Sequence, residues 1–207
     1  MTDGTSGGTS SGTKGATSGG TTAYVALLRG INVGGARKVP MAGLRQLLAD
    51  RGYGRVRTLL QSGNAVFTGP EASTERVTAE LEAALADRFG FSVDCLVLTA
   101  REWREAVGRC PFPTERIEPT TLHVLFLGGP PADHPIAASD PDRFAPDAFR
   151  LGEHEIFVRV PDGLGRSALG RLMAKPWPGG TATARNWRTV VRLRELADEA
   201  EAEAEAA

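Results

Sequence analysis

Four short segments of the chain are rich in glycine, asparagine or serine, three of them also carry arginine, and these residue types suit the binding of an anion. The first, residues 28–41 (LRGINVGGARKVPM), leads from a short apolar run into a helical pattern. Glycines let backbone N–H groups face an anion without a side-chain clash, and a helix N-terminus adds positive potential. The spacing fits neither the Walker nor the GxGxxG pattern, so a tight turn with solvated cations is the competing interpretation. The candidate ligand-binding residues here are Arg29, Asn32, Gly34, Gly35, Arg37 and Lys38.

The other three segments are residues 61–64 (QSGN), 162–167 (DGLGRS) and 185–189 (RNWRT). The first reads as a hairpin turn, for which serine, glycine and asparagine need no further explanation. The other two are predicted to open helices, where a cation opposes the helix dipole and a bound anion would relieve the conflict. The candidate ligand-binding residues that they add are Ser62, Asn64, Arg166, Ser167, Arg185, Asn186 and Arg188.

No residue can be assigned a catalytic role from the sequence. No carboxylate pair stands out for acid–base chemistry, and Ser167 lacks the GxSxG context of a nucleophilic serine. Cys95 and Cys110 lie far apart without a CxxC motif, and the three histidines are scattered. The sequence therefore predicts neither a disulfide framework nor a metal site. Whether the protein is an enzyme stays open, and the cofactor, if any, is unknown.

The elements that would position the first two segments follow from hydrophobic patterning. Short apolar runs predict strands at 24–31, 56–60, 65–67 and 91–97, and residues 56–67 read as a hairpin. Apolar residues at helical spacing predict helices at 40–51 and 74–89, with Ser73 or Thr74 as a cap and glycines as stops. The order strand, helix, strand, strand, helix, strand is that of the ferredoxin-like, or split βαβ, unit.

The same order can be traced a second time after a connecting helix at 100–109. Strands are predicted at 122–127, 148–151, 155–160 and 181–184, with a proline-rich passage at 130–138, a helix at 164–173 and a last helix capped by Asn186. We therefore expect an α+β fold of two tandem ferredoxin-like halves, with antiparallel sheets and helices packed on one face. The predicted divisions are 1–22, 23–99, 100–198 and 199–207.

The two ends of the chain differ from its body. Residues 1–22 are almost all glycine, serine and threonine without the features of a signal peptide, and are predicted to be a disordered tail. Residues 199–207 alternate acidic residues with alanine and are predicted to fray. No segment is apolar enough to span a membrane, so we expect no membrane contact and a cytoplasmic location. Nearly all cations are arginines, which suit carboxylate or phosphate contacts, although genome composition also explains the bias.

Taken together, the four segments resemble a known family. Residues 29–35 (RGINVGG) with 38–41 (KVPM), then 61–64, 162–167 and 183–188 (TARNWR), are similar to the bacterial family called domain of unknown function 1697. The resemblance implies a soluble bacterial protein with a duplicated ferredoxin-like α+β fold, and it implies no reaction. The sequence departs from the family pattern at Ala184, where a second threonine is common.

These observations predict a ligand-binding protein that holds a small phosphate- or carboxylate-bearing molecule in a cleft between the two halves. The alternatives are a nucleic-acid-binding module and a protein-interaction scaffold without enzymatic activity. Nucleic acid is the weaker candidate partner, because the third strand offers only Phe67 for base stacking and the RNP1 pattern is missing. The oligomeric state is not indicated.

Overall fold

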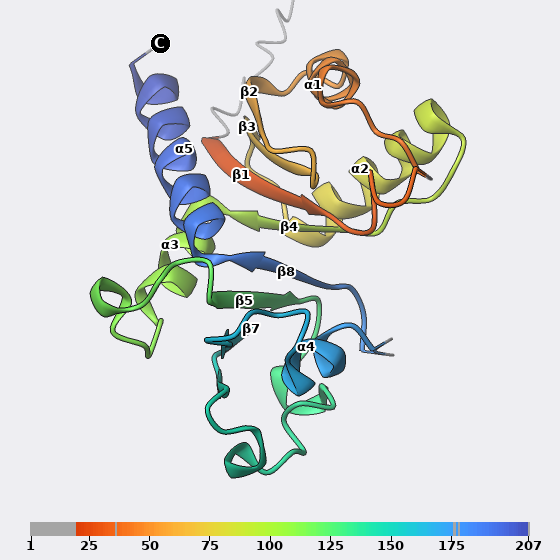
Figure 1. The fold of residues 1–207 in the computed structure, drawn as a ribbon. Helices are drawn as coiled ribbons and strands as arrows, with labels where there is room; N and C mark the ends of the chain where they lie inside the picture. The colour runs from red at the N-terminus through yellow and green to blue at the C-terminus, as the bar shows by residue number, and fades with distance from the viewer. Residues whose placement is uncertain (1–19, 36, 176, 178, 207) are drawn as a thin grey trace, which may run out of the picture.

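The computed structural model describes residues 20–206 except 36, 176 and 178, and within them the chain forms two four-stranded antiparallel sheets. The first sheet contains β1 (Thr21–Leu28), β2 (Gly54–Leu59), β3 (Asn64–Pro70) and β4 (Cys95–Thr99), in the order β2-β3-β1-β4 (Figure 1). β1 lies inside this sheet and is buried from Ala23 to Leu28, which explains its unbroken apolar sequence. β4 is an edge strand.

Two helices cover one face of this sheet. They are α1 (Met41–Asp50) and α2 (Thr74–Phe89), and their apolar stripes pack against Tyr24, Ala26 and Leu28 of β1. The Ser73 hydroxyl accepts a hydrogen bond from the Arg76 backbone N–H at the start of α2, and Gly90 ends the helix in the left-handed conformation. Both are the signals that the sequence predicts for this helix.

The second sheet repeats the arrangement. It contains β5 (Leu122–Leu127), β6 (Ala148–Leu151), β7 (Glu155–Arg159) and β8 (Ala182–Asn186), in the order β6-β7-β5-β8. α4 (Ala168–Met173) connects β7 to β8 and packs on the outer face of this sheet. The passage between β5 and β6 holds only the 3-10 turns η2 (Pro131–Asp133) and η3 (Pro141–Phe144), because prolines supply no backbone donor for a regular helix. A further 3-10 turn, η1 (Thr114–Arg116), precedes β5.

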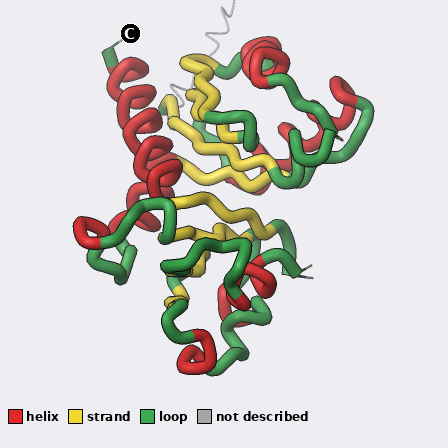
Figure 2. The backbone as a smooth tube through the Cα atoms, in the orientation of Figure 1, coloured by secondary structure: helices red, strands yellow, loops and turns green. Residues whose placement is uncertain are grey.

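The prediction that helices pack on one face of the sheets is wrong for both sheets. α3 (Ala100–Gly108) and α5 (Trp187–Glu205) share a core with the other face of the first sheet and with the facing side of the second sheet (Figures 1 and 2). The alternation of β1 requires this, because Ala23, Val25 and Leu27 point away from α1 and α2 and must also be buried. Trp103 of α3 stacks on Phe126 of β5, with 4.5 Å between the ring centroids, so this core ties α3 to the second sheet.

The acidic end of the chain also differs from expectation. Residues 199–205, predicted to fray, continue α5 to Glu205. Ala200 is fully buried in the core between the halves, and Glu199 and Glu203 form ion pairs with Arg57 of β2. At the other end, Thr21 and Thr22 belong to β1, while the rest of the predicted tail, residues 1–19, lies outside the described residues. No helix in the described part of the chain is long and apolar enough to span a membrane.

Candidate functional site

The loop after β1 is closed by Asn32 rather than held open for a ligand. The Asn32 Nδ2 donates to the backbone oxygens of Val39 at 3.0 Å and Gln61 at 2.7 Å, and its Oδ1 accepts from the Val39 N–H. These bonds use the whole amide and tie the loop to the β2–β3 turn. Gly34 and Gly35 have positive φ angles, and both are exposed together with Arg37 and Lys38. Arg29 is paired with Asp94 at 3.6 Å.

The β2–β3 turn packs against the same loop. Gly63 has a φ of 81°, and a Cβ atom at this position would lie 2.7 Å from both the Leu28 Cβ and the Ile31 Cδ1. Only glycine fits here, because such a contact is much shorter than a van der Waals distance. The turn therefore brings Ser62 and Asn64 next to the end of β1. Asn64 is fully buried and its Nδ2 donates to the Leu59 oxygen at 2.7 Å and to the Ser62 Oγ at 3.1 Å.

Arg185 is the residue that links these two segments to the second half. It lies in β8 rather than in a helix, and its buried guanidinium reaches across to the first half. The Nε donates to the Asn64 Oδ1, and the NH2 nitrogen donates to the backbone oxygens of Leu28 at 2.9 Å, Ser62 at 3.3 Å and Gly63 at 3.4 Å. The NH1 nitrogen donates to the Thr183 Oγ1 and the Ala184 oxygen, both at 2.8 Å.

All six acceptors of Arg185 are neutral. Burial lowers the pKa of the guanidinium to about 10, so the group stays protonated at neutral pH. Its donors are filled by protein atoms, which leaves no free N–H for a phosphate or carboxylate. In the structure Arg185 therefore has the role of a buried connection between the halves.

The remaining predicted segment, residues 162–167, lies apart from the other three. Ser167 is the N-cap of α4: its Oγ accepts from the Gly170 N–H and donates to Asp147 Oδ2 at 2.6 Å. α4 packs on the outer face of the second sheet, whereas Arg185 faces the first half. Exposed Arg166 precedes the cap, so the expected conflict between this cation and the helix dipole does not arise. The structure brings together three of the four segments.

The last two candidates lie at the start of α5. Asn186 caps this helix as predicted, accepting at its Oδ1 from the Thr189 N–H at 2.9 Å. Arg188 is 70% exposed and pairs with Glu118 at 3.5 Å.

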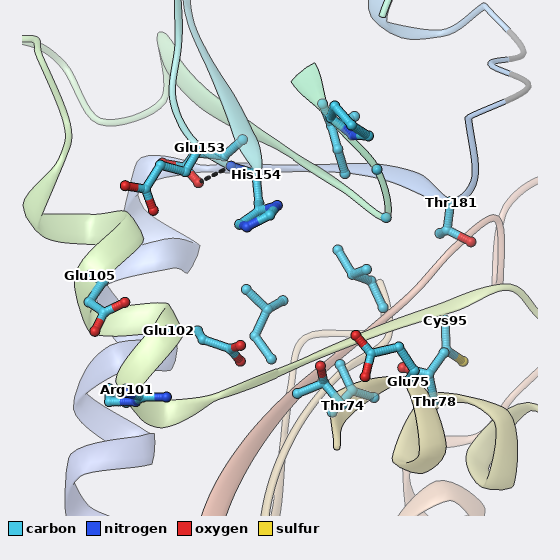
Figure 3. A pocket seen from close by; sticks show the side chains of 18 of the residues that line it. Thr74, Glu75, Thr78, Cys95, Arg101, Glu102, Glu105, Glu153, His154 and Thr181 are labelled. Carbon is cyan, nitrogen blue, oxygen red and sulfur yellow. Dashed lines mark hydrogen bonds between the residues drawn. The ribbon is translucent and has the colours of Figure 1, made fainter. Parts of the chain in front are cut away.

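A cleft of about 690 Å³ does lie between the two halves, but none of the thirteen predicted ligand-binding residues lines it. One wall comes from the start of α2, the edge strand β4 and α3, which follows β4 directly. The opposite wall comes from residues 127–130, the β6–β7 turn and Thr181. Figure 3 shows His154 and Glu102 directed into the space from opposite sides, with Thr74, Glu75 and Thr78 on α2.

The polar lining of the cleft is acidic. Six glutamates contribute to it against two arginines: Glu75, Glu82, Glu102, Glu105, Glu153 and Glu155 against Arg101 and Arg109. Buried Glu155 accepts from the Arg109 Nε at 2.9 Å, and this hydrogen bond raises the pKa of Arg109. Glu153 also pairs with Arg109, at 3.1 Å. Among the described residues, no group of three histidine, cysteine or acidic side chains is arranged to hold a metal ion.

Two of the glutamates hold the outer edge of β4. The Glu82 Oε1 accepts from the Cys95 N–H at 2.7 Å, and the Glu102 Oε2 accepts from the Thr99 N–H at 2.7 Å. Glu102 also completes a capping box with Thr99 at the start of α3. Burial strongly raises the pKa of the Cys95 thiol beside this edge, so Cys95 is not an activated nucleophile.

Comparison with known proteins agrees with the resemblance seen in the sequence. A family model described as "Protein of unknown function (DUF1697)" matches residues 21–157. The chain belongs to this family. The matched residues include the loop after β1, the β2–β3 turn and most of the cleft walls, and they end before Ser167 and Arg185.

A solved structure gives the same result. The conserved bacterial protein SP0830 from Streptococcus pneumoniae superposes with a TM-score of 0.71 at 26% sequence identity, covering 86% of this chain and 99% of its own. Among curated proteins, none matches the chain. The similarity therefore supports the family and the fold without supplying an activity.

The sequence also contains a pattern that relates to the cleft and lies outside the predicted anion-binding segments. Glu75 and Glu82 are seven residues apart on α2, and Glu102 and Glu105 lie within one turn of α3. Such spacings place each pair on one helix face. A charged helix face is usually solvated, so only the packing of α2 and α3 around β4 distinguishes these four from other surface glutamates.

Proposed function

We propose that the protein binds a small ligand in the cleft between its two halves, and that the bound group carries positive charge. The observation that carries this proposal is the excess of carboxylates over guanidinium groups in the lining. The binding place is the cleft between the halves, as the sequence suggests. The ligand differs: an amine or guanidinium group takes the place of the phosphate or carboxylate that the sequence suggests. A volume of about 690 Å³ falls in the ordinary range of small-molecule sites.

The electrostatics of the cleft favour a cation at close range. Arg109 already forms ion pairs with Glu153 and Glu155. Arg101 is therefore the other arginine of the lining that could balance the remaining four glutamates. Glu75 and Glu105 are exposed, and Glu82 and Glu102 each accept a backbone N–H as well. Like charges brought together in a partly desolvated site cost several kcal/mol, on the order of what a weak ligand gains, so an anion is disfavoured.

The direct test is a thermal-shift and calorimetry comparison of ligands matched in size and opposite in charge. Spermidine, agmatine and lysine amide form the cationic set, and citrate, glycerol phosphate and a nucleoside monophosphate form the anionic set. The cationic set should raise the melting temperature and the anionic set should not. Ligand at ~100 times its dissociation constant should add ~2.7 kcal/mol to the free energy of unfolding.

Variants that remove single carboxylates test whether the cationic ligand binds in the cleft. Glu75→Gln and Glu105→Gln should each weaken binding of the cationic ligand, because each removes an exposed carboxylate from the lining. Glu115→Gln is the matched control, since Glu115 is equally exposed and lies outside the cleft. Tighter binding by the anionic set, or equal effects of all three substitutions, would contradict the proposal.

A second candidate is an anion at the loop after β1. Arg37 and Lys38 are exposed beside Gly34 and Gly35, and the ion pairs of the described residues include neither cation. This is a surface site outside the cleft. Stabilisation by inorganic phosphate that disappears in Arg37→Gln would support it, and an unchanged response in that variant would exclude it.

Strand topology bears on the fold of each half, and the burial of the aromatic side chains bears on the nucleic-acid alternative. The strand orders β2-β3-β1-β4 and β6-β7-β5-β8 support placing both halves with the ferredoxin-like, split βαβ units, the second with its first helix reduced to 3-10 turns. The nucleic-acid alternative is disfavoured, because Tyr24, Phe67, Phe126 and Phe157 are all fully buried and offer no stacking platform on a sheet.

A further inference from the structure

We propose that the cleft recognises an extended peptide segment that carries two consecutive basic residues and pairs with the edge of β4 at Val97. This inference rests on the proposed function and names the class of its ligand. The feature that carries it is an edge strand that lines the cleft, in which Val97 is paired with no further strand and lies between two positions whose N–H groups are bound by carboxylates.

The availability of Val97 follows from the hydrogen bonds of β4. The N–H groups of Cys95 and Thr99 point away from β1, because side-chain carboxylates accept them. Backbone N–H groups on a strand alternate in direction, so the N–H and C=O of Val97, midway between them, point to the same outer edge. β4 is the edge of its sheet, so no strand of the described residues pairs with Val97 on the outer side, and the side-chain acceptors on this edge serve Cys95 and Thr99. One residue of β4 is therefore positioned to form the pair of hydrogen bonds by which a strand is added to a sheet.

The two carboxylates restrict how a strand can be added. Glu82 and Glu102 occupy the neighbouring N–H groups, which protects the edge against pairing with a long strand. A ligand that pairs only opposite Val97 and keeps both carboxylates in place avoids this obstruction. A short extended segment meets that requirement, and a continuous strand does not.

The positions of the carboxylates select the ligand side chains. Val97 points to the face of the sheet that α2 covers, and Glu75 and Glu82 belong to α2. The side chains of Leu96 and Leu98 point to the other face, where α3 carries Glu102 and Glu105. Successive side chains of an extended peptide also point to opposite faces. Two consecutive basic residues therefore address both carboxylate pairs, whereas basic residues two apart address only one.

The test compares short peptides with blocked ends by calorimetry on the full chain. Acetyl-Gly-Lys-Arg-Gly-amide should bind at least ~10-fold more tightly than acetyl-Lys-Gly-Arg-Gly-amide, in which the two basic residues are two positions apart. N-methylation of the backbone nitrogen opposite Val97 leaves the charge unchanged and removes one donor. It should also weaken binding by ~10-fold, because it removes a hydrogen bond and adds a clash. The Val97 amide should exchange its hydrogen at least ~10-fold more slowly with the dibasic peptide than with spermidine.

Substitution of Glu82 tests whether its charge contributes to peptide binding. Glu82→Gln keeps an oxygen acceptor for the Cys95 N–H and removes the charge, so it should weaken the dibasic peptide without unfolding β4, and Glu115→Gln should have no effect. If both basic spacings and the N-methylated peptide bind equally well, pairing with Val97 is wrong while cation binding stands. If neither peptide nor polyamine binds, the proposed function itself fails.

Discussion

The Nε of Arg185 donates a hydrogen bond to the Oδ1 of Asn64, and the two residues are 121 positions apart in the sequence. Arg185 belongs to β8 of the second sheet, and Asn64 begins β3 of the first. Together with the bonds to the Leu28 and Gly63 oxygens, this contact connects β8 of the second sheet to the end of β1 and the β2–β3 turn of the first. The residues that look most like a ligand site in the sequence thus form an internal joint.

Replacing Arg185 with methionine should destabilise the fold. Methionine fills similar volume but removes the Arg185 donor from the Asn64 Oδ1 and from the buried backbone oxygen of Leu28, while the Gly63 oxygen still accepts from the Leu28 N–H at 2.8 Å. The free energy of unfolding should fall by about 2–4 kcal/mol, measured by urea denaturation. Arg166→Met is the control, because Arg166 is exposed, and it should change stability by less than about 0.5 kcal/mol.

The bond between Arg185 and Asn64 should also appear as an energetic coupling. In a double-mutant cycle of Arg185→Met and Asn64→Ala, the two losses should overlap by about 1–3 kcal/mol, because either substitution alone breaks the same contact. Asn186→Ala paired with Arg185→Met serves for comparison, since Asn186 caps α5 and shares no hydrogen bond with Arg185. Additive losses in both cycles would mean that the contact contributes little to stability.

The two cysteines should differ in reactivity. Burial raises the pKa of both thiols, strongly for buried Cys95 and less for half-buried Cys110. In native protein at pH 8, iodoacetamide should modify Cys110 and leave Cys95 intact, and in urea it should modify both. Mass spectrometry of the alkylated peptides reads the result. Early modification of Cys95 would mean that β4 opens readily.

The raised pKa of Cys95 has a consequence for stability. Above its ordinary pKa of about 8.5, the thiol loses its proton in the unfolded chain and keeps it in the native one. The native state then binds more protons than the unfolded state, so the stability contributed by Cys95 falls as the pH rises. Between pH 8 and pH 10 the advantage of wild type over Cys95→Ala should shrink by about 1–2 kcal/mol. Denaturation curves at the two pH values test this, and an unchanged difference would contradict it.

Removal of the acidic end of the chain should weaken the fold. Truncation after Asp198 deletes buried Ala200, both glutamate partners of Arg57 and one of the two partners of Arg104, Glu201, while Asp198 stays. The exposed ion pairs contribute about 0–1 kcal/mol each, so the total loss should be about 1–3 kcal/mol and should become smaller at high salt. Deleting only residues 206 and 207 should leave the melting temperature unchanged.

The sequence by itself determined most of the elements. Periodicity and caps located β1, α2, α3 and the β2–β3 hairpin, because these depend on residues within a few positions of one another. The motifs were also specific enough to identify the family, since their order along the chain is independent of packing. Asn186 was recognised as a cap for the same local reason.

The tertiary structure alone decided what the polar residues do. Arg185 carries no local sign that its guanidinium will be buried against Asn64, because that contact depends on how two distant sheets are placed. The cleft was hidden for a related reason: Glu82 and Glu102 look like solvated helix residues until α2 and α3 pack on either side of β4. Periodicity tells which face of an element is buried, and only the packing of distant elements determines which charges face one another across a space.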